Sequence, residues 1–347
     1  MIVPARNEEA SLGACLQSLV KQENVSFELI VVDDASSDGT RAIAEQFPDV
    51  IILNAPPVPA GHTGKCNALA AGAGKAAGHW LLFTDADTVH APGSLAKSLA
   101  EAEKRGVSLL SYSPKQEVEG FLERAVMPVI FAELAATYRP SQVSDPASAA
   151  AAANGQYLLV SREAYDDAGG HAGIASSILE DVALARAVKR SGRKIFFRYG
   201  ADAVRTRMYR SFAQLREGWT KNLVLLFPRP GNLAILRFTE FLLIAGSALL
   251  AVLAYHDRRM RLAAILGTVW LAAMSFLWNR IRKAHFSWDA NLLAVFGLPV
   301  FSYLLLRSKL AHSTGNVTWK GRIYPGEGNT ETPRDVVAEV KAGFVEH

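Results

Sequence analysis

The chain has 347 residues, of which 50% are hydrophobic and 20% charged, and its formal net charge is +4. This balance excludes a disordered chain, and the length suits about two domains. Two cysteines, Cys15 and Cys66, exclude a disulfide scaffold and suit a reducing compartment. The mean hydropathy of +0.12 is high for a water-soluble chain, so a soluble part joined to an apolar part is expected.

The first 210 residues alternate short apolar runs with helical stretches. The chain opens on an apparent strand end, so the first strand is short or begins upstream. Strands are predicted at 27–32, 50–53 and 79–84, and helices at 40–47, 65–77 and 94–104, the last ending at Gly106. Alternation at this spacing predicts an α/β fold with a mostly parallel sheet flanked by helices.

Acidic residues follow the predicted strands. Asp33 and Asp34 come after 27–32, and Asp85 and Asp87 come after 79–84. Ligands of such sheets bind at the carboxyl ends of the strands, and clustered carboxylates need a cation or hydrogen-bond donors nearby. The Asp-Ala-Asp turn suits Mg²⁺ or Mn²⁺, which leave coordination positions open for substrate phosphates.

Two further places in the sequence have both a functional and a structural interpretation. Glu180 and Asp181 open a helical segment, 182–190, where they either complement the helix dipole or supply a general base. Residues 61–65 lack the spacing of a phosphate-binding P-loop. Lys65, at a glycine-rich helix start, either meets a diphosphate or is a solvated lysine.

Three uncharged apolar stretches lie in the C-terminal part, at 241–255, 262–278 and 290–306. A stretch of 17 residues forms a helix of about 26 Å, against roughly 30 Å of bilayer hydrocarbon. With Trp278, Trp288 and Tyr303 as interfacial anchors, three transmembrane helices are predicted. The alternatives are a buried helical core, or one stretch that is interfacial or re-entrant. Basic residues flank every stretch, so charge gives no orientation. Residues 325–347 are predicted to be a polar tail with one weak helical segment.

A basic segment precedes the apolar stretches. It carries eleven Lys or Arg between 186 and 221 against Asp202 and Glu217. Such a segment attracts an anionic membrane leaflet, at about 1 kcal/mol per residue near the surface. Nucleic acid is the competing partner for basic clusters, but no recognition motif supports it, so no nucleic-acid binding is expected.

The motifs taken in order resemble those of the family 2 glycosyltransferases of the GT-A fold. The resemblance covers 1 to about 226 and rests on IVPARNEE (2–9), VVDDASSDGT (31–40), GHTGKCNAL (61–69), FTDADT (83–88), NGQYLLVSREAYDDAGG (154–170) and LEDVALA (179–185). The apolar C-terminal part and NVTWKGRIY (316–324) resemble the lipid-directed branch, with hopanoid, carotenoid or ceramide-type acceptors.

The resemblance implies a role for each matching residue. The nucleotide-sugar would be held by Pro4, Ala5, Arg6, Glu8, Asp33, Asp34, Lys65, Asp85 and Ala86. Asp87, with Asp85, would bind Mg²⁺ or Mn²⁺. Asp181 would be the catalytic base, with Glu180 beside it. The acceptor or the membrane surface would lie near Gln156, Arg216, Trp219 and Lys221.

One motif departs from the family. The family often has a Gln-x-x-Arg-Trp sequence near the membrane, but here Gly218 precedes Trp219, and Gln214 and Arg216 are out of register. Lys221 could replace the missing cation. The departure argues against the processive polysaccharide synthases. Trp219 is then either a site residue or an interfacial anchor.

Together these features predict an inverting, metal-dependent hexosyltransferase of the cell membrane of a bacterium. It would move a sugar from a UDP- or GDP-linked donor to a lipid hydroxyl. The predicted domains are a cytoplasmic catalytic domain at 1–210, an interfacial segment at 211–232, transmembrane helices at 233–310 and a polar tail at 311–347. The alternatives are a polysaccharide-chain synthase and a non-catalytic nucleotide-sugar-binding membrane protein.

Overall fold

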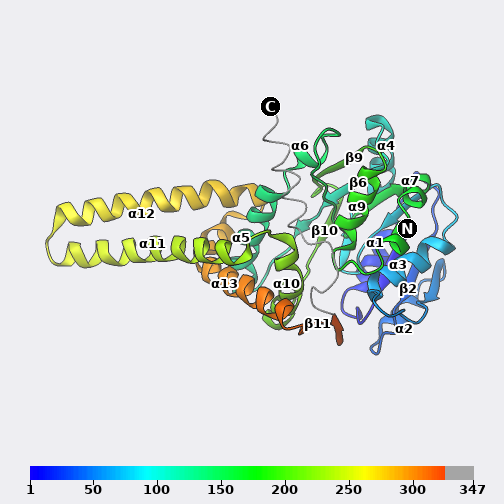
Figure 1. The fold of residues 1–347 in the computed structure, drawn as a ribbon, viewed down its shortest axis with the longest axis horizontal. Coiled ribbons are helices and arrows are strands. Elements are labelled where there is room, and N and C mark those ends of the chain that lie inside the picture. Colours follow the sequence, from blue (N-terminus) through cyan, green and yellow to red (C-terminus); the bar gives the residue numbers. More distant parts are fainter. Residues whose placement is uncertain (325–347) are drawn as a thin grey trace. The chain divides into compact units, whose positions relative to one another are not determined.

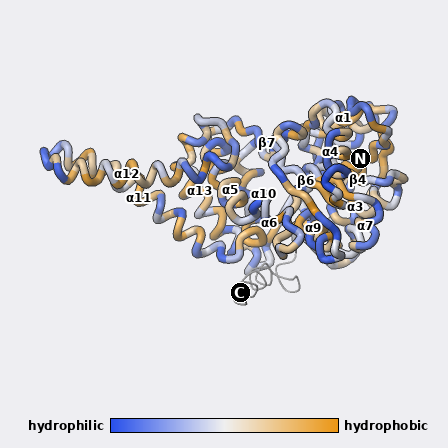
Figure 2. Tube along the Cα trace, turned by 90° about the horizontal axis from the view of Figure 1, so that it is seen from above, coloured by the Kyte–Doolittle hydropathy of each residue, from blue (hydrophilic) through white to orange (hydrophobic). Residues whose placement is uncertain are grey.

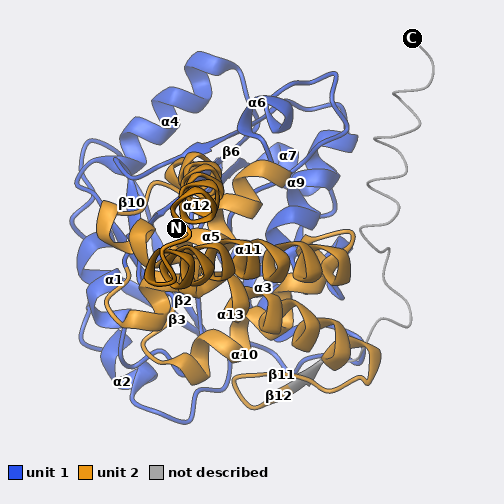
Figure 3. Ribbon diagram, turned by 90° about the vertical axis from the view of Figure 1, so that its left-hand side faces the viewer, with its two compact units in different colours: residues 1–117, 138–208, 329–347 blue, residues 118–137, 209–328 orange. Residues whose placement is uncertain are grey.

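The computed structural model describes residues 1–324, so the weak helical segment predicted at 325–347 lies outside the described residues. The described chain forms two compact units (Figure 3). The sheet unit contains Met1–Glu117 and Tyr138–Met208. The helical unit contains Val118–Thr137 and the described chain from Tyr209 onward. The predicted domain at 1–210 did not separate 118–137, which groups with the helices.

The sheet unit is built on a seven-stranded sheet in the order β3-β2-β1-β4-β8-β6-β9 (Figure 1). Its strands are β1 (Ile2–Ala5), β2 (Leu29–Asp33), β3 (Val50–Asn54), β4 (Trp80–Phe83), β6 (Leu109–Ser113), β8 (Leu158–Ser161) and β9 (Ile195–Tyr199). Only β8 runs antiparallel to its neighbours, so the sheet is mostly parallel as predicted. A second sheet joins β5 (Thr88–His90), β10 (Val204–Thr206) and β7 (Lys115–Gln116).

Helices cover both faces of the large sheet because its strands are apolar on both sides. Ile2 and Ile30 pack in one core, whereas their neighbours Val3 and Val31 pack in the other, as the two-residue period of a strand requires. The helices are α1 (Leu12–Leu19), α2 (Thr40–Ala44), α3 (Gly64–Lys75), α4 (Ser94–Arg105), α6 (Pro140–Val143), α7 (Arg162–Asp167), α8 (Gly170–Gly173) and α9 (Glu180–Arg190). α1 and α4 pack on one face, and α3 and α9 pack on the other.

Two helix ends follow from local sequence. The hydroxyl of Thr63 caps α3 by accepting a hydrogen bond from the backbone N–H of Cys66 at 3.2 Å. α4 ends at Gly106, where φ is 60°, as the sequence predicts.

Gly72 allows α3 to lie close to the sheet. A methyl group placed there would come within 2.6 Å of Ile2 Cγ2 and 3.0 Å of Val32 Cγ2. Gly72→Ala is therefore expected to lower the free energy of unfolding by about 1–3 kcal/mol, because both neighbours are core side chains. Gly74→Ala in the same helix meets nothing within 4 Å. It should raise stability by about 0.5–1 kcal/mol, and thermal unfolding of the pair checks the contrast.

The helical unit contains five long helices among the residues described. They are α5 (Phe121–Thr137), α10 (Phe212–Leu226), α11 (Pro230–His256), α12 (Met260–Ile281) and α13 (Trp288–Ser313), followed by the hairpin strands β11 (Val317–Trp319) and β12 (Arg322–Tyr324). Part of the segment predicted to be a polar tail, 311–347, is thus the end of α13 and a β-hairpin.

Three helices of this unit are long and apolar enough to cross a membrane: Pro230–His256, Met260–Ala284 and Trp288–Ser313. They contain the three predicted apolar stretches. Length and composition therefore make membrane association the expectation for this unit.

Four of the eleven cations in the basic segment have partners within the sheet unit. Arg193 pairs with Glu163 and Asp167, and Arg198 pairs with Glu101 and Asp202. Lys189 donates to the backbone oxygens of Val143 and Ala150, and Arg205 pairs with Glu117. Counting the segment's charges as attraction to a leaflet therefore overestimates it, because these cations already have partners.

Candidate functional site

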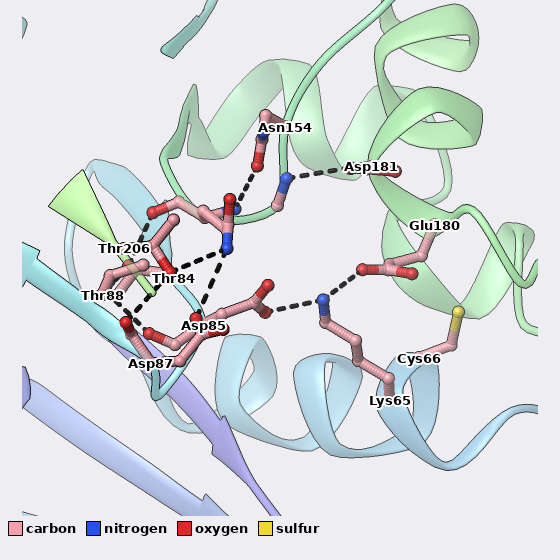
Figure 4. Close-up of polar contacts among 12 residues, drawn as sticks. Lys65, Cys66, Thr84, Asp85, Asp87, Thr88, Asn154, Glu180, Asp181 and Thr206 are labelled. Carbon is pink, nitrogen blue, oxygen red and sulfur yellow. Dashed lines mark hydrogen bonds and ion pairs between the residues drawn. The ribbon is translucent and has the colours of Figure 1, made fainter. Parts of the chain in front are cut away.

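The acidic turn connects β4 to β5 and is held from several sides (Figure 4). The hydroxyl of Thr88 donates to the backbone oxygen of Asp85 at 2.8 Å, and that of Thr206 donates to the backbone oxygen of Asp87 at 3.0 Å. The amide of Gln156 lies 3.5 Å from a carboxylate oxygen of Asp87. The turn is therefore rigid before any ligand binds.

A buried polar network lies beneath this turn. The hydroxyl of Thr84 donates to the backbone oxygen of Gln156 at 2.8 Å and lies 2.9 Å from His90 Nε2. Burial lowers the pKa of His90 to about 3, so its ring is neutral at physiological pH. A neutral network adds hydrogen bonds without a charge that would compete with the carboxylates above it.

Lys65 joins the acidic turn to the start of α9. Its Nζ lies 2.6 Å from Asp85 Oδ1 and 2.6 Å from Glu180 Oε1. Burial opposes the charge of the lysine, but the two carboxylates outweigh it and hold its pKa well above the usual value. The Lys65 side chain is 32% exposed, so a permanently charged cation faces the site. The thiol of the adjacent Cys66 is buried, which raises its pKa to about 12 and leaves it unreactive.

Asp181 is oriented by two backbone hydrogen bonds. Its Oδ2 accepts from the N–H of Gly155 at 2.9 Å, and its Oδ1 accepts from the N–H of Val182 at 2.8 Å. Burial, together with the negative charge of Glu180, raises the pKa of Asp181 to about 6. A fixed carboxylate with a pKa near neutrality has the properties required of a general base.

Gly155 lies between these groups. A methyl group there would come within 3.3 Å of both Lys65 Nζ and Glu180 Oε1, and 3.7 Å from Asp181 Cβ. Gly155→Ala is expected to lower the turnover number by about 10- to 100-fold, because small displacements of reacting groups are costly. Gly173→Ala, whose nearest atom is Ala168 O at 3.5 Å, is the control. Equal turnover numbers for the two variants in a steady-state assay would contradict this placement.

The residues predicted to hold the nucleotide follow β1 and β2, which are adjacent and parallel. Ala5 is paired with Asp33 across the two strands. Asp33 is 8% and Asp34 6% exposed, and the guanidinium of Arg6 donates to the backbone oxygen of Asp34 at 2.6 Å. Pro4, Ala5, Arg6, Glu8, Asp33 and Asp34 therefore gather at one edge of the sheet, the edge that also carries Asp85, Ala86 and Asp87.

Two residues in these loops adopt the left-handed conformation although they are not glycine. They are Asn7, with φ of 52°, and Ala35, with φ of 55°. Such conformations cost energy in residues with a Cβ and concentrate at ligand sites. They shape the loops after β1 and β2 around the same edge of the sheet.

The acidic turn fits a divalent cation that is shared with a ligand. Asp85 and Asp87 offer hard carboxylate oxygens, which Mg²⁺ and Mn²⁺ prefer. Within residues 1–324 no three His, Cys, Asp or Glu side chains gather into a complete metal site. The donor set therefore suits an ion that takes its other ligands from phosphate oxygens and water.

Gln156 is buried beside the acidic turn. It is 4% exposed, and its amide contacts Thr206 at 3.2 Å as well as Asp87. These contacts make it a support for the acidic turn, and its predicted place near an acceptor stays a prediction. Its neighbour Asn154 accepts a hydrogen bond from the N–H of Gln156 at 2.9 Å and shapes the same loop.

The other residues predicted near the acceptor belong to the helical unit. Trp219 is 3% exposed and packs against Phe131 and Tyr209, so it is a core residue of that unit and not an interfacial anchor. Arg216 is exposed on α10, and Lys221 lies 5.4 Å from the ring centroid of Trp319. A role of Arg216 and Lys221 toward an acceptor stays a prediction.

Several supporting residues were missed from the sequence. Thr84, Thr88, His90 and Thr206 hold the acidic turn, and Gly155 opens the space beside Asp181. Gly155 lies in the motif at 154–170, so a glycine at that position could have indicated that the backbone comes close to other groups. No local pattern pointed to Thr206, because it reaches the turn only through the pairing of β10 with β5.

Comparisons with known proteins agree with this fold. The model of glycosyl transferase family 2 matches residues 1–167. The 4,4'-diaponeurosporenoate glycosyltransferase of Staphylococcus aureus strain MRSA252 is 30% identical over 339 residues, covering 93% of this chain and 87% of the relative. That of strain USA300 is 28% identical over 338 residues, with coverage of 93% and 87%.

A solved structure shares the fold. The mannosyltransferase PcManGT of Pyrobaculum calidifontis, in complex with GDP-Man and Mn²⁺, superposes with a TM-score of 0.50 at 19% identity, covering 89% of this chain and 85% of its own. The parallel sheet with its strand-end acids is a GT-A nucleotide-sugar-binding fold. The chain belongs to glycosyltransferase family 2 and is a glycosyltransferase.

Proposed function

We propose that this protein is an inverting, metal-dependent hexosyltransferase that moves a sugar from a UDP- or GDP-linked donor to a lipid acceptor at a membrane. The observation that carries the proposal is the cluster of Lys65, Asp85, Glu180 and Asp181 at the edge of the sheet. It combines a cation for a diphosphate with an oriented carboxylate for the acceptor.

The donor would bind at the carboxyl ends of β1, β2 and β4. The loops after β1 and β2, with Asp33 and Asp34, would hold the base and ribose. Lys65 would meet the diphosphate, which carries more negative charge than either carboxylate that it now contacts. Asp85 and Asp87 would hold Mg²⁺ or Mn²⁺, which when bound stabilises the negative charge that develops on the leaving diphosphate.

Asp181 would accept the proton of the acceptor hydroxyl as the new glycosidic bond forms. Its two backbone hydrogen bonds keep the carboxylate in one orientation, and Glu180 beside it is committed to Lys65. A single base without a second free carboxylate nucleophile supports one direct displacement, which inverts the anomeric centre. Because Lys65 pairs with Glu180, Asp181 rather than Glu180 is the carboxylate assigned as the base.

A second acceptor chemistry is favoured by the names of the relatives. Diaponeurosporenoate denotes a carboxylate, and the staphylococcal enzymes are named for its glycosylation. A carboxylate is already ionised near neutral pH and brings no proton to remove. A carotenoid-type carboxylate would therefore need Asp181 for positioning more than for proton transfer.

The membrane would be reached through the helical unit. Its apolar helices support an integral protein of the bacterial cell membrane, with the sheet unit in the cytoplasm, where nucleotide-sugars are made. A lipid acceptor could then meet a water-soluble donor at the membrane surface. A polysaccharide-chain synthase is less well supported, because the Arg-Trp pair of such enzymes is Gly218-Trp219 here.

Activity toward a hydroxyl acceptor is expected to fall as the pH drops through about 6. Asp181 must be ionised to accept a proton, and its raised pKa places the protonated form below that pH. Lys65→Met should move this acid limb to higher pH, because removal of the cation leaves the carboxylate less stabilised. Profiles of kcat/KM from about pH 5 to 8 for the native enzyme and for Lys65→Met check the position of the acid limb and its movement. A flat profile in the native enzyme would contradict the assignment of the base.

The function itself is tested with membranes that contain the protein. Incubation with radiolabelled UDP- and GDP-sugars, followed by lipid extraction, should give a labelled lipid. A labelled water-soluble polymer would instead identify a polysaccharide synthase, and donor binding without any product would identify a non-catalytic binding protein.

A further inference from the structure

The three helices that could cross a membrane differ in how far protein covers them. In their most apolar stretches, 17% of the residues of α11 and 6% of those of α12 are buried, against 50% for α13. Figure 1 shows α11 and α12 side by side and extending away from α5 and α10, whereas α13 lies among those helices at the base. Helices of similar mean hydropathy, 1.6 to 1.9, therefore lie in two different environments.

The exposed apolar side chains of α11 and α12 face most directions. At 100° per residue, those of α11 spread over about 260° of the helix surface, and those of α12 lie on opposite sides of it. They include Ile235, Leu236, Leu243, Val252 and Tyr255 on α11, and Leu262, Ile265, Leu271 and Phe276 on α12. A helix that is apolar nearly all round is buried in a protein core or in lipid, and little of this pair is covered by the protein described, which favours lipid.

The exposed apolar side chains of α13 form a single stripe. They fall within an arc of about 80° and are Trp288, Leu292, Phe296, Tyr303, Leu306 and Leu310. Arg307 and Lys309 are exposed on either side of this stripe near its end. α13 therefore has one narrow side for lipid, and the two cations near its end suit the charged headgroups at the membrane surface.

The opposite face of α13 is packed on protein. Gly297 lies against Ala125 of α5, where a methyl group would be only 2.0 Å from the backbone oxygen. The hydroxyl of Ser308 donates to Thr220 O at 2.7 Å, and His312 Nε2 lies 2.9 Å from Lys221 O, both on α10. This face of α13 is covered by α5 and α10, so only its opposite side can contact lipid.

A charged cluster marks where the α11–α12 pair leaves the rest of the helical unit. Arg237 Nη1 lies 2.5 Å and Arg280 Nη2 2.8 Å from Glu240 Oε2, and both arginines also lie within 3.3 Å of Glu133 of α5. All four side chains are 9–13% exposed. Charges are rare within the hydrocarbon of a bilayer, so this cluster limits how deeply the unit enters it.

The pair beyond this cluster is slightly shorter than a typical membrane crossing. From Phe241 to His256, α11 rises about 24 Å, against roughly 30 Å of bilayer hydrocarbon, so a crossing here would thin the bilayer locally or draw the flanking charged residues to its surfaces. The tip then gathers Asp257, Arg258, Arg259 and Arg261, and Figure 2 shows this hydrophilic end beyond the apolar arm. A charged tip at that distance suits the opposite membrane surface.

We infer that the chain crosses the membrane twice, through α11 and α12, and that α13 lies in the plane of the membrane interface with its apolar stripe in lipid. Two crossings return the chain to its starting side, so residues before Pro230 and the hairpin at 316–324 share one side. The inference rests on the proposed function only for its membrane location and is independent of the transfer chemistry.

Cysteine labelling tests the number of crossings in the full chain. The two native cysteines are buried, so single cysteines at Glu103, Arg258 and Thr314 can be followed with a membrane-impermeant maleimide in sealed vesicles of each orientation. Arg258→Cys should react from the side opposite to Glu103→Cys and Thr314→Cys. Reaction of Arg258→Cys and Thr314→Cys from one side and of Glu103→Cys from the other would establish three crossings, and reaction of all three from one side would establish none.

The orientation of α13 is tested with spin labels at Leu292, Phe296, Tyr303 and Leu310. An in-plane helix places all four labels at one shallow depth, whereas a spanning helix makes depth vary along an axis of about 27 Å between Leu292 and Leu310. Labels shielded from both oxygen and a water-soluble relaxant would show that a second copy covers the stripe. Either of these last results overturns the inference. Transferase activity of each variant separates a wrong topology from a wrong function.

Discussion

Asp181→Asn is expected to lower the rate of sugar transfer to a lipid hydroxyl by about 100- to 10,000-fold while donor affinity stays nearly unchanged. The amide oxygen can still accept one of the two backbone hydrogen bonds, from Gly155 or Val182, but it cannot take up the acceptor proton. Calorimetric titration of the donor together with steady-state kinetics would separate binding from transfer.

The comparison variant for this test is Asp166→Asn. Asp166 is an exposed acid on α7, so the substitution makes the same chemical change away from the site. Native turnover in Asp181→Asn with a hydroxyl acceptor would rule out the base. Loss confined to the hydroxyl acceptor, with transfer to a carboxylate retained, would support proton transfer as the role of Asp181. Equal loss with both acceptors would indicate that it positions the acceptor instead.

Asp87→Ala is expected to weaken metal-dependent donor binding by about 100-fold or more, because a divalent ion contributes several kcal/mol to holding a diphosphate. The backbone of the turn should persist, since Thr206 bonds to the backbone oxygen of Asp87 and not to its carboxylate. Donor titrations with Mn²⁺ and with a chelator measure the effect.

In the native enzyme the two titrations should differ, and in Asp87→Ala they should coincide. Asp49→Ala, at an exposed acid before β3, should behave like the native enzyme. If metal-dependent binding survives in Asp87→Ala, a residue other than Asp87 is the metal ligand. Metal-independent activity of the native enzyme would remove the metal from the proposal.

Much of the fold could be predicted because its strands and helices follow from local patterns of residue type. The apolar run Leu29–Asp33 ends in an acid, and the apolar run Trp80–Phe83 is followed by Asp85 after one residue, which identifies both the strands and the places where they stop. In a parallel sheet those ends meet at one edge, so Asp33, Asp34, Asp85 and Asp87 could be placed together without coordinates.

The partners within the site could not be predicted in the same way. Lys65 reaches Glu180 and Asp85, and Gly155 donates to Asp181, across long stretches of chain. Only the packing of α3 and α9 on one face of the sheet brings these residues together. The burial of Gln156 and Trp219 could not be predicted for the same reason, because burial depends on neighbours that are remote in sequence.

The sequence by itself determined the α/β class, the acids at the strand ends, the motif series of the family and the three apolar helices, because each depends on residue type and short-range period. The tertiary structure alone decided which charges are paired, as in Arg193 and Arg198, and which face of α13 is covered. A charge or an apolar side chain counts toward a membrane or a ligand only when no other part of the protein already satisfies it.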